Sequence, residues 1–71
     1  MARTKLTIEV EKETDGRWIG EIAELPGVLA YGRTRKQAVT RVQALALRVL
    51  ADRLDHGEDV PQVTQNFLVV A

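Results

Sequence analysis

Few residue types that could do chemistry occur in this sequence. Its 71 residues include no cysteine and no serine, and the single histidine is His56. A threonine activated by His56 is conceivable. However, His56 falls at the end of a predicted helix, where an imidazole interacts with the terminal carbonyl groups and the helix dipole. Without cysteine, and with one histidine, thiolate and histidine metal sites are not expected. We predict no catalytic residue, no bound metal and no cofactor.

Carboxylates are the next candidates. Glu9, Glu11 and Glu13 occupy alternate positions of one predicted strand, and Glu21 lies on the next strand. A two-metal nuclease needs acids that converge from several elements. No second acidic cluster is placed to complete such a site, so the pattern favours a solvated strand face. A residual metal-dependent nuclease that uses Glu9, Glu11 and Glu21 stays open as an alternative.

Basic residues gather before and along the helix, while the whole chain has ten basic and ten acidic residues and no net charge. Arg41 and Arg48 are seven positions apart and therefore lie on one side of a helix. They could contact phosphates or acidic groups of a partner chain. No stacking aromatic accompanies them, so we expect no nucleic-acid binding by this chain alone and keep it as an alternative.

The elements that position these residues follow from hydrophobic periodicity. Alternation predicts strands over 5–13 and 17–23, joined at Thr14-Asp15-Gly16, where Asp-Gly favours a turn. Leu25-Pro26-Gly27 breaks the ladder before a short strand over 28–31. Thr34 and Gln37 form a capping box for a helix over 35–55. His56-Gly57 ends the helix, and a last strand covers 62–70.

The resulting order, β-β-β-α-β, predicts one α+β domain over residues 1–71. A right-handed crossover lays the last strand beside the first, which gives sheet order 3-2-1-4 with the helix on one face. One apolar stripe of the helix is expected to cover the first two strands, with Gly20 making room for the helix. The stripe consists of Ala38, Val39, Val42, Leu45, Ala46, Val49 and Leu50; the strand residues are Leu6, Ile8, Val10, Trp18, Gly20 and Ile22.

One helix leaves apolar residues uncovered. The other sheet face is expected to carry Ile19, Leu29 and Tyr31, with Leu68 or Val70. The outer side of the helix carries Ala44, Leu47, Ala51 and Leu54. A domain this small buries only about 60% of its unfolded surface. Since it has no disulfide or metal, we expect it to form an oligomer.

No targeting or membrane segment is predicted. The N-terminus has no long apolar run behind it, as a signal peptide would need. No stretch approaches the ~20 apolar residues of a membrane span. We expect a cytoplasmic protein.

One stretch resembles a known family. The run from Asp15 to Val28, with Glu24-Leu25-Pro26-Gly27 inside it, is followed by Gly32-Arg33-Thr34 and Ala38. Together with Gly57 and Pro61, this order and spacing resembles the HicB family of antitoxin-like proteins over nearly the whole chain.

The resemblance implies a truncated ribonuclease-H-like fold without catalytic acids, and a homo-oligomer, usually a dimer or tetramer. It also implies a partner, a small RNA-cleaving toxin of the HicA type. Many HicB proteins add a DNA-binding domain, but this chain ends at Ala71, directly after the last strand. We therefore expect no autoregulation by this chain alone.

These expectations combine in one hypothesis, a non-enzymatic binding module that masks a HicA-like toxin. The alternative is an orphan HicB-like domain with nucleic-acid binding or residual nuclease activity. The pattern does not separate the surface for self-association from the surface for a partner. The predicted contact residues for both are Ile19, Leu29, Tyr31, Arg41, Ala44, Leu47, Arg48 and Ala51.

Overall fold

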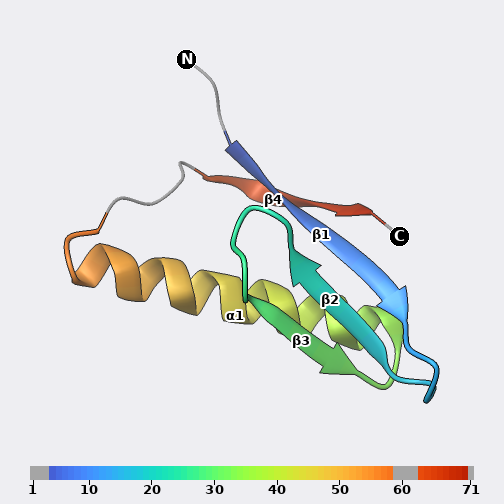
Figure 1. Ribbon diagram of the computed structural model, residues 1–71. Helices are drawn as coiled ribbons and strands as arrows, with labels where there is room; N and C mark the ends of the chain where they lie inside the picture. The colour runs from blue at the N-terminus through green and yellow to red at the C-terminus, as the bar shows by residue number, and fades with distance from the viewer. Residues whose placement is uncertain (1–3, 59–62, 71) are drawn as a thin grey trace.

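A computed structural model of the chain describes residues 4–58 and 63–70. The elements in chain order are β1 (Thr4–Lys12), β2 (Trp18–Ile22), β3 (Leu29–Gly32), α1 (Arg35–Asp55) and β4 (Val63–Val70) (Figure 1). The helix bounds match the prediction. Most strand ends are shifted by one residue from the predicted bounds.

The described strands form one sheet in the order β3-β2-β1-β4, in which β1 pairs parallel to β4 and the other pairs are antiparallel. This confirms the α+β fold and the predicted strand order. The relation to a ribonuclease-H-like fold stays a prediction. The face assignments of Val63, Phe67 and Leu68 lie outside the described side chains, as does Pro61 of the family pattern.

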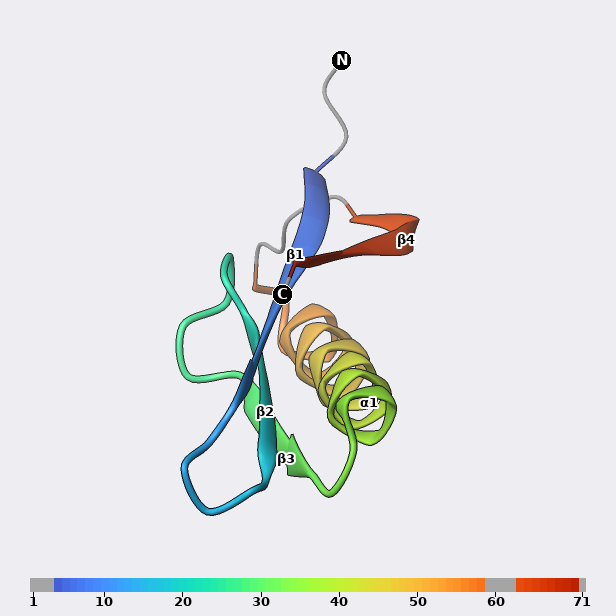
Figure 2. The same cartoon turned by 90° about the vertical axis from the view of Figure 1, so that its right-hand side faces the viewer.

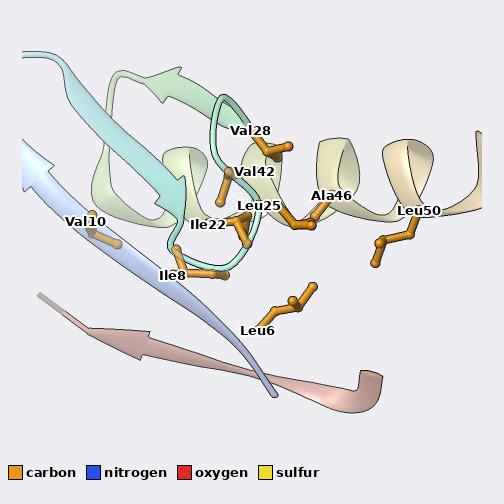
Figure 3. Close-up of a cluster of buried hydrophobic side chains, with 9 residues drawn as sticks. All are labelled: Leu6, Ile8, Val10, Ile22, Leu25, Val28, Val42, Ala46 and Leu50. Atoms are coloured by element: carbon orange, nitrogen blue, oxygen red, sulfur yellow. The ribbon is translucent and has the colours of Figure 1, made fainter. Parts of the chain in front are cut away.

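Helix α1 lies along one face of the sheet, which the end-on view shows clearly (Figure 2). Ala38, Val42, Ala46 and Leu50 are buried, and Val39, Leu45 and Val49 pack partly against the core, as the stripe predicts. A cluster of buried side chains joins three of these helix residues to strand and turn residues (Figure 3). Its members are Leu6, Ile8, Val10, Ile22, Leu25, Val28, Val42, Ala46 and Leu50.

The turn between β2 and β3 contributes to this core, which the sequence pattern did not predict. The amide of Val28 donates to the Leu25 carbonyl at 3.0 Å, and Gly27 has φ of +88°. With Pro26 before Gly27, this is a type II turn, which needs positive φ at its third residue. Leu25 is 2% exposed, so the turn returns an apolar side chain to the core.

Both helix ends are capped where the sequence predicts, although the Gln37 side chain bonds to the residue before the N-cap, not to the N-cap amide as in a standard capping box. Thr34 Oγ1 accepts from the Gln37 amide at 3.0 Å, and Gln37 Oε1 accepts from the Arg33 amide at 2.7 Å. At the other end, Gly57 has φ of +73°, and its amide donates to the Leu54 carbonyl. The Glu58 amide donates to the Arg53 carbonyl, which completes a Schellman motif.

Two glycines let the helix approach the sheet. A Cβ at Gly32 would lie 2.5 Å from the Ala38 backbone nitrogen, whereas at Gly20 the nearest atoms, of Ala38 and Val42, lie at 3.1 Å. This confirms the predicted role of Gly20 and adds the stricter requirement at Gly32.

Replacing Gly32 by alanine is therefore expected to destabilise the fold by about 3 kcal/mol, the upper end of overpacking costs. Gly20→Ala is the matched control, with an expected loss of about 1 kcal/mol because its closest contacts, the Ala38 carbonyl oxygen and a Val42 methyl group, lie at 3.1 Å and need to give only slightly. Urea unfolding followed by Trp18 fluorescence measures both. If Gly32→Ala lowers the free energy of unfolding no more than Gly20→Ala does, close packing of the helix does not require a glycine at position 32.

Candidate functional site

The sheet face opposite α1 combines carboxylates with uncovered apolar side chains. Strand pairing aligns Glu9 with Glu21 and Glu11 with Ile19, and all four lie on this face. Glu9, Glu11 and Glu21 line a shallow hollow of about 310 Å³ with Val10, Ile19 and Val70. Leu29 and Tyr31, on β3, are each 36% exposed, and Val70 is 43% exposed. We call this the acidic sheet face: Glu9, Glu11, Glu21, Ile19, Leu29, Tyr31 and Val70.

Two carboxylates face each other across the β1–β2 ladder. Residues directly opposite in an antiparallel pair have Cβ atoms about 5 Å apart, and like charges there are destabilising. Glu9 and Glu21 are such a pair. The repulsion has no structural benefit within the described residues, and a cationic group of a binding partner would relieve it.

One cation does lie at the margin of this face. The Arg17 guanidinium carbon lies 4.4 Å from the centre of the Tyr31 ring, within cation–π range. Arg17 Nε also donates to Asp15 Oδ2 at 2.7 Å. The hydrogen bond from the Arg17 amide, together with the guanidinium, lowers the pKa of Asp15. Sequence reasoning missed this contact, because only strand pairing brings Arg17 beside Tyr31.

The acidic sheet face does not assemble a metal site from the described side chains. No three of the described histidine, aspartate or glutamate residues are arranged to hold an ion. The nuclease alternative with Glu9, Glu11 and Glu21 therefore gains no geometric support from residues 4–58 and 63–70.

Glu24, the first residue of the Glu24-Leu25-Pro26-Gly27 motif, makes a structural contact with β1. Its Oε1 accepts from the Thr7 amide at 2.7 Å, and its Oε2 accepts from the Thr7 hydroxyl at 2.8 Å. The carboxylate thereby extends the β1–β2 pairing past the end of β2. Partial desolvation opposes ionisation, but the two hydrogen bonds from Thr7 outweigh it and lower the pKa of Glu24. Nothing in the sequence spacing pairs Glu24 with Thr7.

A second concave surface lies between β3 and the helix. Arg41 and Arg48 both line it, in agreement with the prediction that they share one side of the helix, and its volume is about 460 Å³. Arg41 Nη1 donates to the Tyr31 carbonyl at 3.1 Å, on the outer edge of β3. We call this the edge groove: Ala30, Thr40, Arg41, Ala44, Leu45 and Arg48.

The outer side of α1 forms a third surface. Leu47 and Leu54 are 53% and 60% exposed, and Ala51 is exposed between them. We call these three residues the outer helix row. The eight predicted contact residues thus separate into three groups: Ile19, Leu29 and Tyr31 on the acidic sheet face; Arg41, Ala44 and Arg48 in the edge groove; Leu47 and Ala51 in the outer helix row.

His56 occupies the C-cap position of α1, as predicted. Its Nδ1 lies 2.8 Å from the Asp52 carbonyl oxygen and 3.5 Å from Asp52 Oδ1. Bonding to the carbonyl requires a proton on Nδ1. The imidazole therefore serves the helix end.

Comparison with known proteins finds a distant similarity. The chain is 26% identical over 58 residues to the UPF0150 protein Ta0767 of Thermoplasma acidophilum, which covers 82% of this chain and 84% of that protein. UPF0150 denotes HicB-like proteins, so this similarity agrees with the resemblance seen in the sequence. No family model and no solved structure matches the chain.

Within the described residues, no helix is both long enough and apolar enough to cross a bilayer. The cytoplasmic location stays a prediction.

The Thr7–Glu24 contact generates a pH prediction. Because the folded pKa of Glu24 lies below its unfolded value of about 4.3, the contact stabilises the fold above that pH. This contribution is lost as the pH falls through the folded pKa. Glu24→Gln is expected to cost about 1 kcal/mol at pH 7 and to remove this part of the pH dependence.

Urea unfolding at pH 7 and at pH 3 measures the effect. Glu11→Gln is the control, because it leaves the Thr7–Glu24 contact intact. If Glu24→Gln costs no more than Glu11→Gln at pH 7, the contact does not stabilise the fold.

Proposed function

We propose that this domain is a non-enzymatic binding module that covers a small basic RNA-cleaving protein of the HicA type. The observation that carries the proposal is the acidic sheet face, where three carboxylates lie among partly exposed apolar side chains and Arg17 stacks on Tyr31 at the margin. The similarity to a UPF0150 protein supports the same class of function.

The chemistry of the partner follows from the chemistry of the face. A protein that cleaves RNA must bind the phosphate backbone, and it does so with lysine and arginine side chains. Glu9, Glu11 and Glu21 present negative charge to such a surface. Ile19, Leu29 and Tyr31 supply apolar contact area beside the charges. Charge complementarity speeds association and selects the partner, while buried apolar and aromatic groups supply most of the affinity.

Masking needs no catalysis by this chain. A domain seated on the RNA-binding surface of the toxin excludes RNA sterically, and its carboxylates take the place of phosphates. The like-charge pair Glu9–Glu21 then gains a cation from the partner. A pair that costs stability in the free domain and gains contacts in a complex is typical of a functional surface.

A binding test separates this function from folding. Glu9→Gln combined with Glu21→Gln is expected to leave the domain equally or slightly more stable, because the facing charges are removed. The same variant is expected to bind a HicA-like toxin about tenfold more weakly or worse, the test partner being any small basic protein that a neighbouring reading frame encodes. Calorimetric titration and protection of an RNA substrate measure binding and masking.

The control is Glu58→Gln, an exposed carboxylate beyond the helix end. Equal inhibition by wild type and the double variant would contradict the role of the acidic sheet face. Metal-dependent RNase activity of the domain alone, lost in Glu9→Gln plus Glu11→Gln, would overturn the non-enzymatic assignment. If no neighbouring gene encodes a short basic protein, the proposal that the partner is a HicA-like toxin loses support.

The outer helix row supports self-association, the second part of the proposal. Contiguous exposed apolar residues mark interfaces, and Leu47 and Leu54 are the most exposed large apolar residues described. A second copy that packs its own row there would form a two-fold pair of helices.

Light scattering at micromolar concentration is expected to show a dimer or tetramer, and Leu47→Glu with Leu54→Glu is expected to give a monomer. Leu29→Glu is the matched control. Leu29 lies on the sheet face opposite α1, so this variant should keep the oligomer. A wild-type monomer under these conditions would refute self-association.

A further inference from the structure

The edge groove has features that neither the outer helix row nor the acidic sheet face explains. We propose that it binds an extended, acidic peptide segment of another protein, which adds as a strand to β3. The inference does not depend on the proposed toxin function, although this edge borders the acidic sheet face at Leu29 and Tyr31.

The first argument concerns the backbone of β3. The Ile22 amide donates to the Val28 carbonyl, so hydrogen-bonded pairs along β2–β3 fall at Gly20–Ala30 and Trp18–Gly32. Bonding alternates along an antiparallel ladder. The N–H and C=O groups of Leu29 and Tyr31 therefore point away from β2, to the open edge. This row of groups is what strand addition uses.

The second argument is that a side chain already occupies one of the backbone groups at this edge. Arg41 Nη1 bonds to the Tyr31 carbonyl, while the other outward groups of Leu29 and Tyr31 have no hydrogen-bond partner among the described residues. A side chain is easily displaced from an exposed position. An incoming strand takes over the Tyr31 carbonyl, and the freed Arg41 guanidinium is then available to a carboxylate on that strand.

The third argument is charge. The groove has cations at Arg41 and Arg48, small apolar walls at Ala30, Ala44 and Leu45, and no carboxylate in its lining. Seven residues of helix span about 10 Å and four residues of extended chain span about 13 Å, a difference that the long arginine side chains cover. Residues i, i+2 and i+4 of a strand share one face. A segment with acidic, small apolar and acidic residues at these positions matches both arginines and the space between them.

A second copy of this chain fits the groove poorly. A two-fold pairing of β3 with itself would set the same groove against its own image. Arg41 and Arg48 would then face arginines of the other copy, and like charges across an interface disfavour association. Charge complementarity therefore selects an acidic segment.

The test uses the peptide Thr-Glu-Val-Ala-Val-Glu-Thr and the ¹⁵N-labelled wild-type chain. Saturable shifts of the Leu29 and Tyr31 amides are expected, together with slower exchange of these amides with solvent. The same peptide with lysine in place of both glutamates is expected not to bind. Arg48→Gln should weaken binding about tenfold, and Arg35→Gln, an exposed helix residue outside the groove, should leave it unchanged.

Three results would overturn the proposal. The first is no saturable shift at millimolar peptide. The second is equal binding of the lysine peptide. The third is tighter binding of a single-stranded oligouridine than of the acidic peptide, lost in Arg41→Gln with Arg48→Gln, which would assign the groove to nucleic acid. Spectra of each free variant establish that it is folded.

Discussion

The contact on which the structure depends is the close approach of α1 to the sheet at Gly32 and Gly20. The Ala38 backbone nitrogen lies only 2.5 Å from where a Cβ on Gly32 would be, so the glycine lets the helix pack closely against β2 and β3. Helix α1 then closes one face over a core that includes Ile8, Ile22 and Val42. A single helix covers only one face of such a sheet. The other face, the edge of β3 and the outer side of the helix stay uncovered because of this packing.

The segment between β2 and β3 supports that packing in two directions. Pro26 and Gly27 make the type II turn, and Leu25 and Val28 on either side of it are buried in the core. Glu24 reaches the opposite way and binds Thr7 on β1 with both carboxylate oxygens. The turn therefore holds the end of β2 to both the core and the neighbouring strand. Its distinctive residues are accounted for by these contacts.

Periodicity and caps were enough to predict most of the fold. Thr34, Gln37 and Gly57 specify the helix ends locally, so α1 could be placed to the residue. The strand order followed from the handedness of the crossover. Contacts between residues distant in sequence, such as Glu24 with Thr7 and Arg17 with Tyr31, could not be predicted, because no period links them. The sequence also grouped Ala44 with Leu47, whereas the curvature of the helix surface puts Ala44 in the groove beside β3.

A zero net charge conceals a separation of charge over the surface. Glu9, Glu11 and Glu21 lie on the open side of the sheet, whereas Arg41 and Arg48 flank the groove at its β3 edge. Neither group of charges neutralises the other, because the sheet and its core lie between the carboxylates and the helix. Each surface is therefore complementary to a partner of opposite charge, even though the whole molecule attracts neither sign at long range. The two surfaces meet at β3, because Leu29 and Tyr31 give side chains to the acidic sheet face and backbone groups to the open edge.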